Sequence, residues 1–167
     1  MELFKNISLY TAVLLTGLSA GLFYAWQVSV IPGTKLISDK NYLDTMQSIN
    51  RAIQNPAFAL IFFGSFLLLL AATYTQYQEG SKSAFIIITA AMVCYLVGTI
   101  GITMLGNVPM NEALDKIDLN NMTQNALHQT RTTYEHKWNQ LHLARTVFSV
   151  VAFALSLLTC FLNTNSN

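Results

Sequence analysis

Four long apolar stretches constrain this chain more than any other feature of its sequence. They cover residues 7–31, 56–77, 83–106 and 141–162. The hydrocarbon layer of a bilayer is crossed by roughly 20 helical residues, and a helix satisfies its own backbone hydrogen bonds there. The sequence therefore predicts an all-α fold, an integral membrane four-helix bundle with the lipid bilayer as its main partner.

The composition supports a membrane protein and excludes other classes. Hydrophobic residues make up 53% of the chain and charged residues 10%, whereas charged residues average about 25% in soluble domains. The formal net charge is +1, and without a cluster of Lys and Arg it argues against a nucleic-acid partner. A chain of 167 residues has room for one compact domain, so we expect residues 1–167 to form a single membrane domain.

The first apolar stretch has a second interpretation, because a signal peptide also combines a basic start, here Lys5, with an apolar core. That core usually has about 7 to 15 residues. The stretch at 7–31 is longer, which favours a retained span. We expect Pro32-Gly33 to end this helix and the third span to break at Asn107–Asn111.

Polar segments connect the spans at one end of the predicted bundle. Apolar residues recur at helical spacing within 38–55, and Ser38 or Asp39 is a suitable N-cap for a helix there. Segment 112–137 is also expected to be helical over much of its length. Alternating spans bring both segments to the same end, so we expect amphipathic loop helices on one side of the bundle.

An unusual polar helix face leads into the fourth span. Steps of three, four and seven residues return to the same side of a helix; here they align Glu135, Trp138, Asn139, His142, Arg145 and Thr146. Ionisable groups near hydrocarbon are costly without partners, so such residues indicate a functional site. The span ends that carry Trp26 and Asn107 lie on the same side, as does segment 47–55. The sequence therefore predicts a polar pocket at one mouth of the bundle.

Motifs along nearly the whole chain resemble those of a known family. They are, in order, Gly21…Trp26…Ser29-Val30…Pro32-Gly33, then Met46-Gln47-Ser48-Ile49-Asn50-Arg51-Ala52-Ile53-Gln54-Asn55-Pro56, then Asn107-Val108-Pro109-Met110-Asn111, and finally Trp138-Asn139…His142…Arg145-Thr146. This series resembles the anthrone oxygenase family and its largely uncharacterised bacterial relatives. The resemblance implies a monooxygenase of the bacterial cytoplasmic membrane that converts an anthrone into an anthraquinone. It also implies a small aromatic substrate, molecular oxygen and no bound metal or flavin.

The chemistry of that resemblance assigns roles to the polar residues. A base must generate the substrate carbanion, and His142 is the natural choice, since the ordinary imidazole pKa of about 6.5 suits proton abstraction near neutral pH. Arg145, Asn107 and Asn139 are expected to stabilise an enolate or superoxide. The expected pocket residues are Trp26, Gln47, Asn50, Asn111, Glu135 and Trp138. Glu135 lies roughly 10.5 Å of helix rise from His142, too far for direct contact with the same imidazole.

Other interpretations of these residues remain open at the level of sequence. His142 and Arg145 also suit hydrogen bonding to helix ends or lipid head groups, and Asn107 and Asn111 suit helix caps. The histidines form no H-x-x-x-H pair, so a zinc site is not expected, although a single axial His142 would suffice for a haem. The alternative to an enzyme is a non-catalytic bundle that binds a lipid-like or aromatic ligand or supports a partner protein.

Overall fold

The computed structural model describes residues 2–164, and those residues contain helices and no strand. Four helices are long and apolar enough to cross a membrane, which indicates a membrane protein. Each contains one of the predicted spans; their bounds are Glu2–Thr34, Pro56–Glu79, Lys82–Asp115 and Gln124–Asn163. The predicted all-α four-helix architecture is confirmed.

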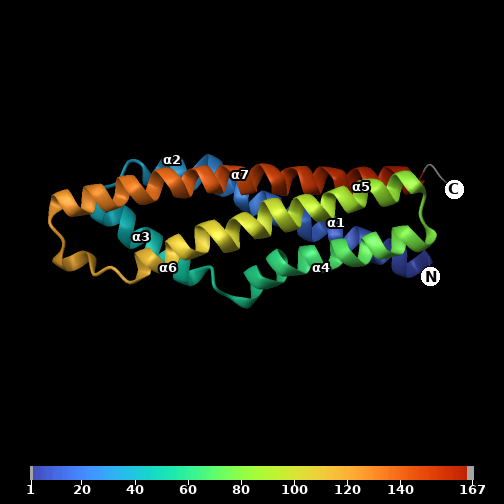
Figure 1. Ribbon diagram of the computed structural model, residues 1–167, viewed down its shortest axis with the longest axis horizontal. Helices are drawn as coiled ribbons and strands as arrows, with labels where there is room; N and C mark the ends of the chain where they lie inside the picture. The colour runs from blue at the N-terminus through green and yellow to red at the C-terminus, as the bar shows by residue number, and fades with distance from the viewer. Residues whose placement is uncertain (1, 165–167) are drawn as a thin grey trace.

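The four long helices run side by side and alternate in direction (Figure 1). The first consists of α1 (Glu2–Ala25), a π-helical turn η1 (Trp26–Val30) and α2 (Ile31–Thr34), and the second is α4 (Pro56–Glu79). The third consists of α5 (Lys82–Val93), the π-helical segments η2 (Cys94–Gly101) and η3 (Thr103–Asn107), and α6 (Val108–Asp115). The fourth is α7 (Gln124–Thr164). Both termini lie at one end of the bundle, together with the turn between α4 and α5.

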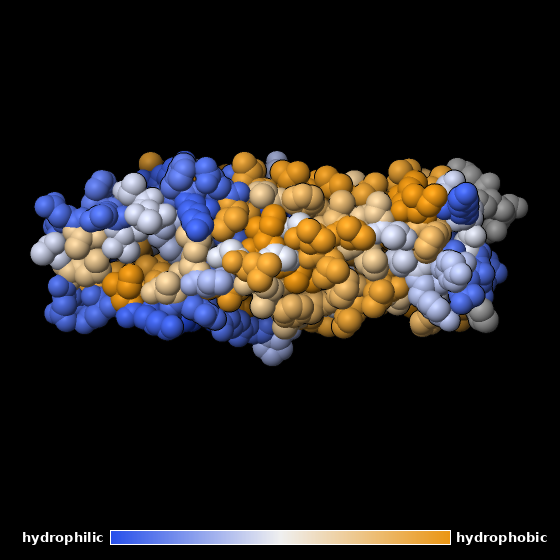
Figure 2. Space-filling model, viewed as in Figure 1, coloured by the Kyte–Doolittle hydropathy of each residue, from blue (hydrophilic) through white to orange (hydrophobic). Residues whose placement is uncertain are grey.

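Shorter elements form a polar cap at the opposite end. They are α3 (Asp39–Ala52) and a 3₁₀ turn, η4 (Leu119–Asn121), which pack against α6 and the first half of α7. Ser38 caps α3 by accepting a hydrogen bond from the Asn41 amide, and Asn55 caps α4 by accepting one from the Phe58 amide. Pro56 follows in the first turn of α4, where its missing N–H has no helical partner to lose. Figure 2 shows the cap as a hydrophilic end beside a broad apolar belt.

The expected break at Asn107–Asn111 is wrong, because the third long helix continues through Pro109 to Asp115. The first long helix ends at Thr34, one residue after the expected end at Pro32-Gly33. Pro32 and Pro109 each lie two residues after the end of a π-helical turn, inside the α-helical segment that follows it. In these turns the Ile31 amide donates to the Trp26 carbonyl, and the Val108 amide to the Thr103 carbonyl. A proline ring normally clashes with the carbonyl four residues earlier. A wider turn contains one extra residue and shifts the preceding carbonyls, which accommodates the ring.

A partly buried arginine, Arg131, connects the cap to α7. The Arg131 guanidinium donates to Asp39 at 3.1 Å, to Glu135 at 2.8 Å and to the Ile37 carbonyl at 2.7 Å. It also lies 4.6 Å from the centre of the Tyr42 ring. Burial, with the nearby Glu135 carboxylate, raises the pKa of the Tyr42 phenol. Arg131 is therefore a structural cation whose charge is balanced by two carboxylates.

Candidate functional site

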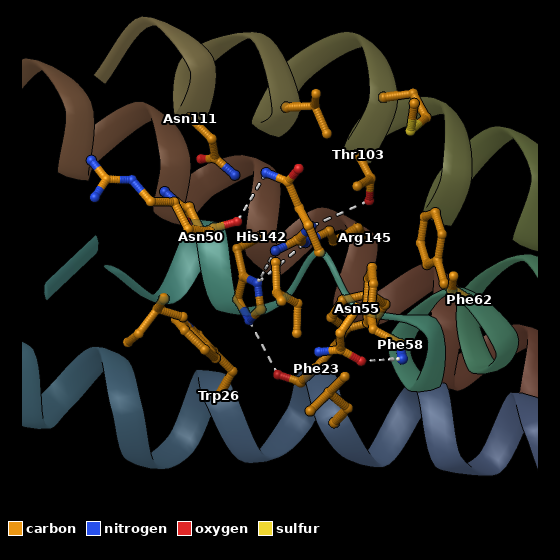
Figure 3. A pocket seen from close by; sticks show the side chains of 18 of the residues that line it. Phe23, Trp26, Asn50, Asn55, Phe58, Phe62, Thr103, Asn111, His142 and Arg145 are labelled. Carbon is orange, nitrogen blue, oxygen red and sulfur yellow. Dashed lines mark hydrogen bonds between the residues drawn. The ribbon is translucent and has the colours of Figure 1, made fainter. Parts of the chain in front are cut away.

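A cavity of about 670 Å³ lies where the cap meets the apolar belt. Its walls come from α1 and η1, the end of α3, the start of α4, η3 with α6, and α7 (Figure 3). This volume falls within the roughly 300–1,000 Å³ of typical small-molecule sites. The cavity is therefore large enough for a ligand of a few fused rings.

Aromatic side chains form much of the cavity wall. Phe58 and Phe62 are one helical turn apart on α4, and their rings stack at a centroid distance of 5.2 Å and an interplanar angle of 17°. Phe23 from α1 meets Phe62 edge-on at 6.3 Å. Across the cavity, the rings of Trp26 and Trp138 lie 6.0 Å apart. Such walls suit a flat aromatic ligand, which can stack on one ring and meet others edge-on.

Arg145 and His142 form the polar centre of the site. Arg145 Nη2 lies 3.0 Å and Nε 3.3 Å from His142 Nδ1, and Nη1 donates to Thr103 Oγ1 at 3.3 Å. A guanidinium can only donate, so Nδ1 must be the accepting nitrogen of the imidazole. Nε2 then carries the proton and donates to the Phe23 carbonyl at 3.1 Å. His142 is thus a neutral imidazole whose lone pair points at Arg145.

The charge of Arg145 has no carboxylate partner in the described part of the chain. Every ion pair found within residues 2–164 joins other residues. The Arg145 side chain is only 8% exposed, and its guanidinium carbon lies 4.7 Å from the Phe23 ring centre and 5.2 Å from that of Trp138. A buried cation without a counter-ion is costly, and a guanidinium in this position has the chemistry to bind an anion or an acidic hydroxyl.

The Trp138 ring is held in place from both sides. It stacks on the His142 imidazole at 5.1 Å with an interplanar angle of 5°. Its Nε1–H donates to Asn111 Oδ1 at 2.9 Å, and the same oxygen accepts a hydrogen bond from the Tyr134 hydroxyl at 2.8 Å. Asn50 Nδ2 donates to that hydroxyl at 3.1 Å. This network fixes the orientation of the aromatic wall beside His142.

Comparison with protein families matches the model described as anthrone oxygenase to residues 47–155. The chain belongs to the anthrone oxygenase family. The match begins at Gln47 in α3 and ends at Leu155 in α7, so it covers the cavity walls other than those of α1 and η1. Neither the curated proteins nor the solved structures include a match.

Within this member of the anthrone oxygenase family, six of the predicted site residues line the cavity. They are Trp26, Asn50, Asn111, Trp138, His142 and Arg145. They come from four different helices, and the structure brings them together although up to 119 positions separate hydrogen-bonded partners of the site. Their roles in catalysis or binding stay predictions.

The other four predicted residues lie outside the cavity lining. Asn107 is fully buried behind it, where Nδ2 donates to the Trp138 carbonyl at 3.4 Å. Gln47 ties α3 to α6 through the carbonyls of Leu114 and Ile117, and Glu135 pairs with Arg131, as described above. Asn139 is half-buried on α7. Asn111 lies inside α6, so the expected cap at this position is wrong.

Sequence reasoning missed the apolar half of the site. Phe23, Phe58, Phe62 and Thr103 all line the cavity, but an apolar span gives no local sign of which Phe faces a ligand. The pair at 58 and 62 has the spacing of one helix face, which was the available signal. Among the described residues, no group of three or more His, Cys, Asp or Glu side chains could hold a metal ion. Metal and haem content therefore stays a matter for measurement.

Proposed function

We propose that this protein oxygenates an enolisable polycyclic phenol of the anthrone type with molecular oxygen. The observation that carries the proposal is the buried Arg145 guanidinium, without a carboxylate partner in residues 2–164, beside His142 in an aromatic-walled cavity. The family match supports the same class of reaction. We further propose that the four long helices place the protein in the bacterial cytoplasmic membrane.

The proposed reaction is balanced by substrate and oxygen alone. The acidic methylene of an anthrone loses a proton to give a carbanion that is also an enolate. This electron-rich anion reduces dioxygen and forms a carbon–oxygen bond, which gives a peroxide at the same carbon. Loss of the second hydrogen and cleavage of the O–O bond then yield the quinone carbonyl and one water. One oxygen atom ends in the product and the other in water.

Arg145 and His142 are suited to the first step of this reaction. The guanidinium has more N–H groups than it uses toward His142 and Thr103, so it can also donate to the substrate oxygen. Donation to the neutral carbonyl oxygen of the bound substrate would draw Arg145 away from His142, before any charge develops there. The released Nδ1 lone pair would then accept the substrate proton. Hydrogen bonds in a ligand-free site often tighten or exchange in this way when substrate binds.

Oxygen uptake by purified protein in detergent, with 1,8-dihydroxyanthrone as substrate, tests the proposal. His142→Gln keeps a polar side chain but removes the base, so turnover above the uncatalysed rate should fall by about 10²-fold or more. His136→Gln is the matched control, because His136 is an exposed histidine of the same helix outside the cavity.

Equal turnover by the His142→Gln protein and the unmodified protein would contradict the proposed base. Metal and haem content are measured on the same sample. A stoichiometric haem or metal that is required for turnover would replace this mechanism with another.

A second candidate is a bundle that binds an aromatic molecule without catalysis. The observation in its favour is that Arg145 already occupies the His142 lone pair, so the resting site has no free base. Saturable binding of 1,8-dihydroxyanthraquinone with no oxygen uptake from the matching anthrone would select this candidate over the enzyme.

A further inference from the structure

The rim of the cavity has two chemically different sides. Exposed polar residues line one side, and Arg51 and Asp115 form an ion pair of 2.6 Å there, beside Gln54 and Glu112. Exposed apolar residues line the other side; they are Leu22, Ala59, Phe63 and Met104. The cavity therefore opens at the boundary between the polar cap and the apolar belt.

The apolar side of the rim belongs to the membrane-spanning helices. Leu22 is 36%, Phe63 44% and Met104 42% exposed, and they come from α1, α4 and η3. All three lie within the helices that are long and apolar enough to cross the bilayer. Their exposed surface thus faces hydrocarbon, as the apolar belt in Figure 2 illustrates for the visible face. This side of the rim is an opening toward lipid.

We propose that the ligand is an amphipathic aromatic molecule that enters from the bilayer and keeps an apolar chain there. Its ring carries an acidic hydroxyl or enol, which binds at Arg145, and its chain leaves the cavity past Ala59, Phe63 and Met104. The ring chemistry rests on the proposed function; the path of the chain rests on the rim alone. A chain directed to the other side would have to cover the Arg51–Asp115 pair, which loses hydration without gaining a partner.

The two possible directions of the opening predict very different affinities for a chain-bearing ligand. If the opening faces lipid, the ligand's apolar chain stays in hydrocarbon. Ligands with and without the chain then have the same affinity when it is expressed per mole of lipid. If the opening faces water only, each methylene must leave hydrocarbon, which weakens binding about fourfold. For a ten-carbon chain the loss would be on the order of 10⁶-fold.

The test compares 1,8-dihydroxyanthraquinone with its 3-decyl derivative in lipid nanodiscs. Both tryptophans of the protein, Trp26 and Trp138, line the cavity. Quenching of their fluorescence therefore reports ligand binding without any turnover. Saturable quenching, displaced by the parent compound, separates binding from quenching by ligand elsewhere in the bilayer. We expect the two affinities, per mole of lipid, to agree within about threefold, because the chain stays in hydrocarbon.

Replacement of either of two alanines by phenylalanine tests the path of the ligand's alkyl chain. Ala59→Phe narrows the lipid side of the rim and should weaken the decyl compound about tenfold more than the parent, by the loss of contact expected from a misfitted rim. Ala57→Phe is the matched control, since Ala57 is also exposed in the same helical turn but lies outside the lining; it should leave both affinities unchanged.

The outcomes separate this inference from the proposed function. Failure of the decyl compound to bind, or equal weakening of both compounds by Ala59→Phe, would overturn the lipid-side opening even if the anthrone is oxygenated. Conversely, chain-tolerant binding without oxygen uptake would refute the oxygenase and leave the lipid-side opening standing.

Discussion

Replacing His142 and Arg145 together by apolar residues should stabilise the fold while removing the ligand site. The variant His142→Phe with Arg145→Met keeps a ring against Trp138, with which His142 now stacks at 5.1 Å, and an unbranched chain in place of the guanidinium. Thr103 keeps its own hydrogen bond to the Thr99 carbonyl at 2.7 Å. No polar side chain that depended on Arg145 is then left without a partner.

The magnitude follows from the desolvation of Arg145. A charge that is 8% exposed and lacks a carboxylate in residues 2–164 loses more in hydration than its hydrogen bonds return, so the double variant should gain about 1–4 kcal/mol. Arg145→Met alone should be nearly neutral. It removes the buried charge but leaves His142 Nδ1 without a donor, which costs about 1–3 kcal/mol.

Arg131→Met is the contrasting control on the same helix. Arg131 is paired with Asp39 and Glu135, and its removal leaves two partly buried carboxylates together. That variant should lose about 2–3 kcal/mol, somewhat less than the loss of a fully buried pair, because these carboxylates retain some exposure to water.

Reversible unfolding by sodium dodecyl sulfate in mixed micelles, without ligand, measures these changes. Quenching of tryptophan fluorescence by 1,8-dihydroxyanthraquinone measures the ligand site in the same samples, and it should disappear in the double variant. A double variant that is destabilised by more than about 1 kcal/mol would show that Arg145 and His142 hold the bundle together. The interpretation of the unpaired cation as a binding group would then be refuted.

Two further predictions concern the packing of the helices and the hydrogen bond of Trp138. A Cβ at Gly98 would overlap the Phe148 ring, whereas one at Gly21 would meet nothing within 4 Å. Gly98→Ala should therefore lower the free energy of unfolding by about 1–3 kcal/mol in the same assay, and Gly21→Ala should not lower it. Equal effects of the two substitutions would contradict this packing. Asn111→Leu leaves the Trp138 N–H and the Tyr134 hydroxyl without their shared acceptor and should weaken anthraquinone binding about tenfold, because Trp138 is no longer held in place. A Trp138 emission maximum that is unchanged in Asn111→Leu would show that this hydrogen bond does not position Trp138.

The bundle and the polar face of the site could be predicted because both are local properties of sequence. Hydropathy over about 20 residues locates a span, and helical periodicity put Trp138, His142 and Arg145 on one side of α7. The same periodicity placed Glu135 and Asn139 with them. It could not exclude these two, because their orientation depends on which neighbour each meets, and for Glu135 that neighbour is Arg131.

The apolar walls could not be predicted for the opposite reason. On an apolar span every side chain is compatible with lipid, so sequence does not show how the helix is rotated about its axis. Packing of α4 against α1 and α5 sets that rotation, and it turns Phe58 and Phe62 inward while Leu60 and Leu67 remain exposed. Long-range contacts alone carry this information.

The two π-helical turns η1 and η3, which helical periodicity did not predict, frame the cavity. The turns that precede Pro32 and Pro109 each contain one residue more than an α-helical turn allows, and they contribute Trp26 and Thr103 to the lining. An extra residue rotates one part of a helix against the other, so a helix can show one face to its packing partners and another to the ligand. π-helical turns occur frequently at functional sites, and departures from local rules concentrate there. A pattern with a period of 3.6 residues cannot describe that rotation, which is why the sequence did not show that Trp26 and Thr103 line the same cavity.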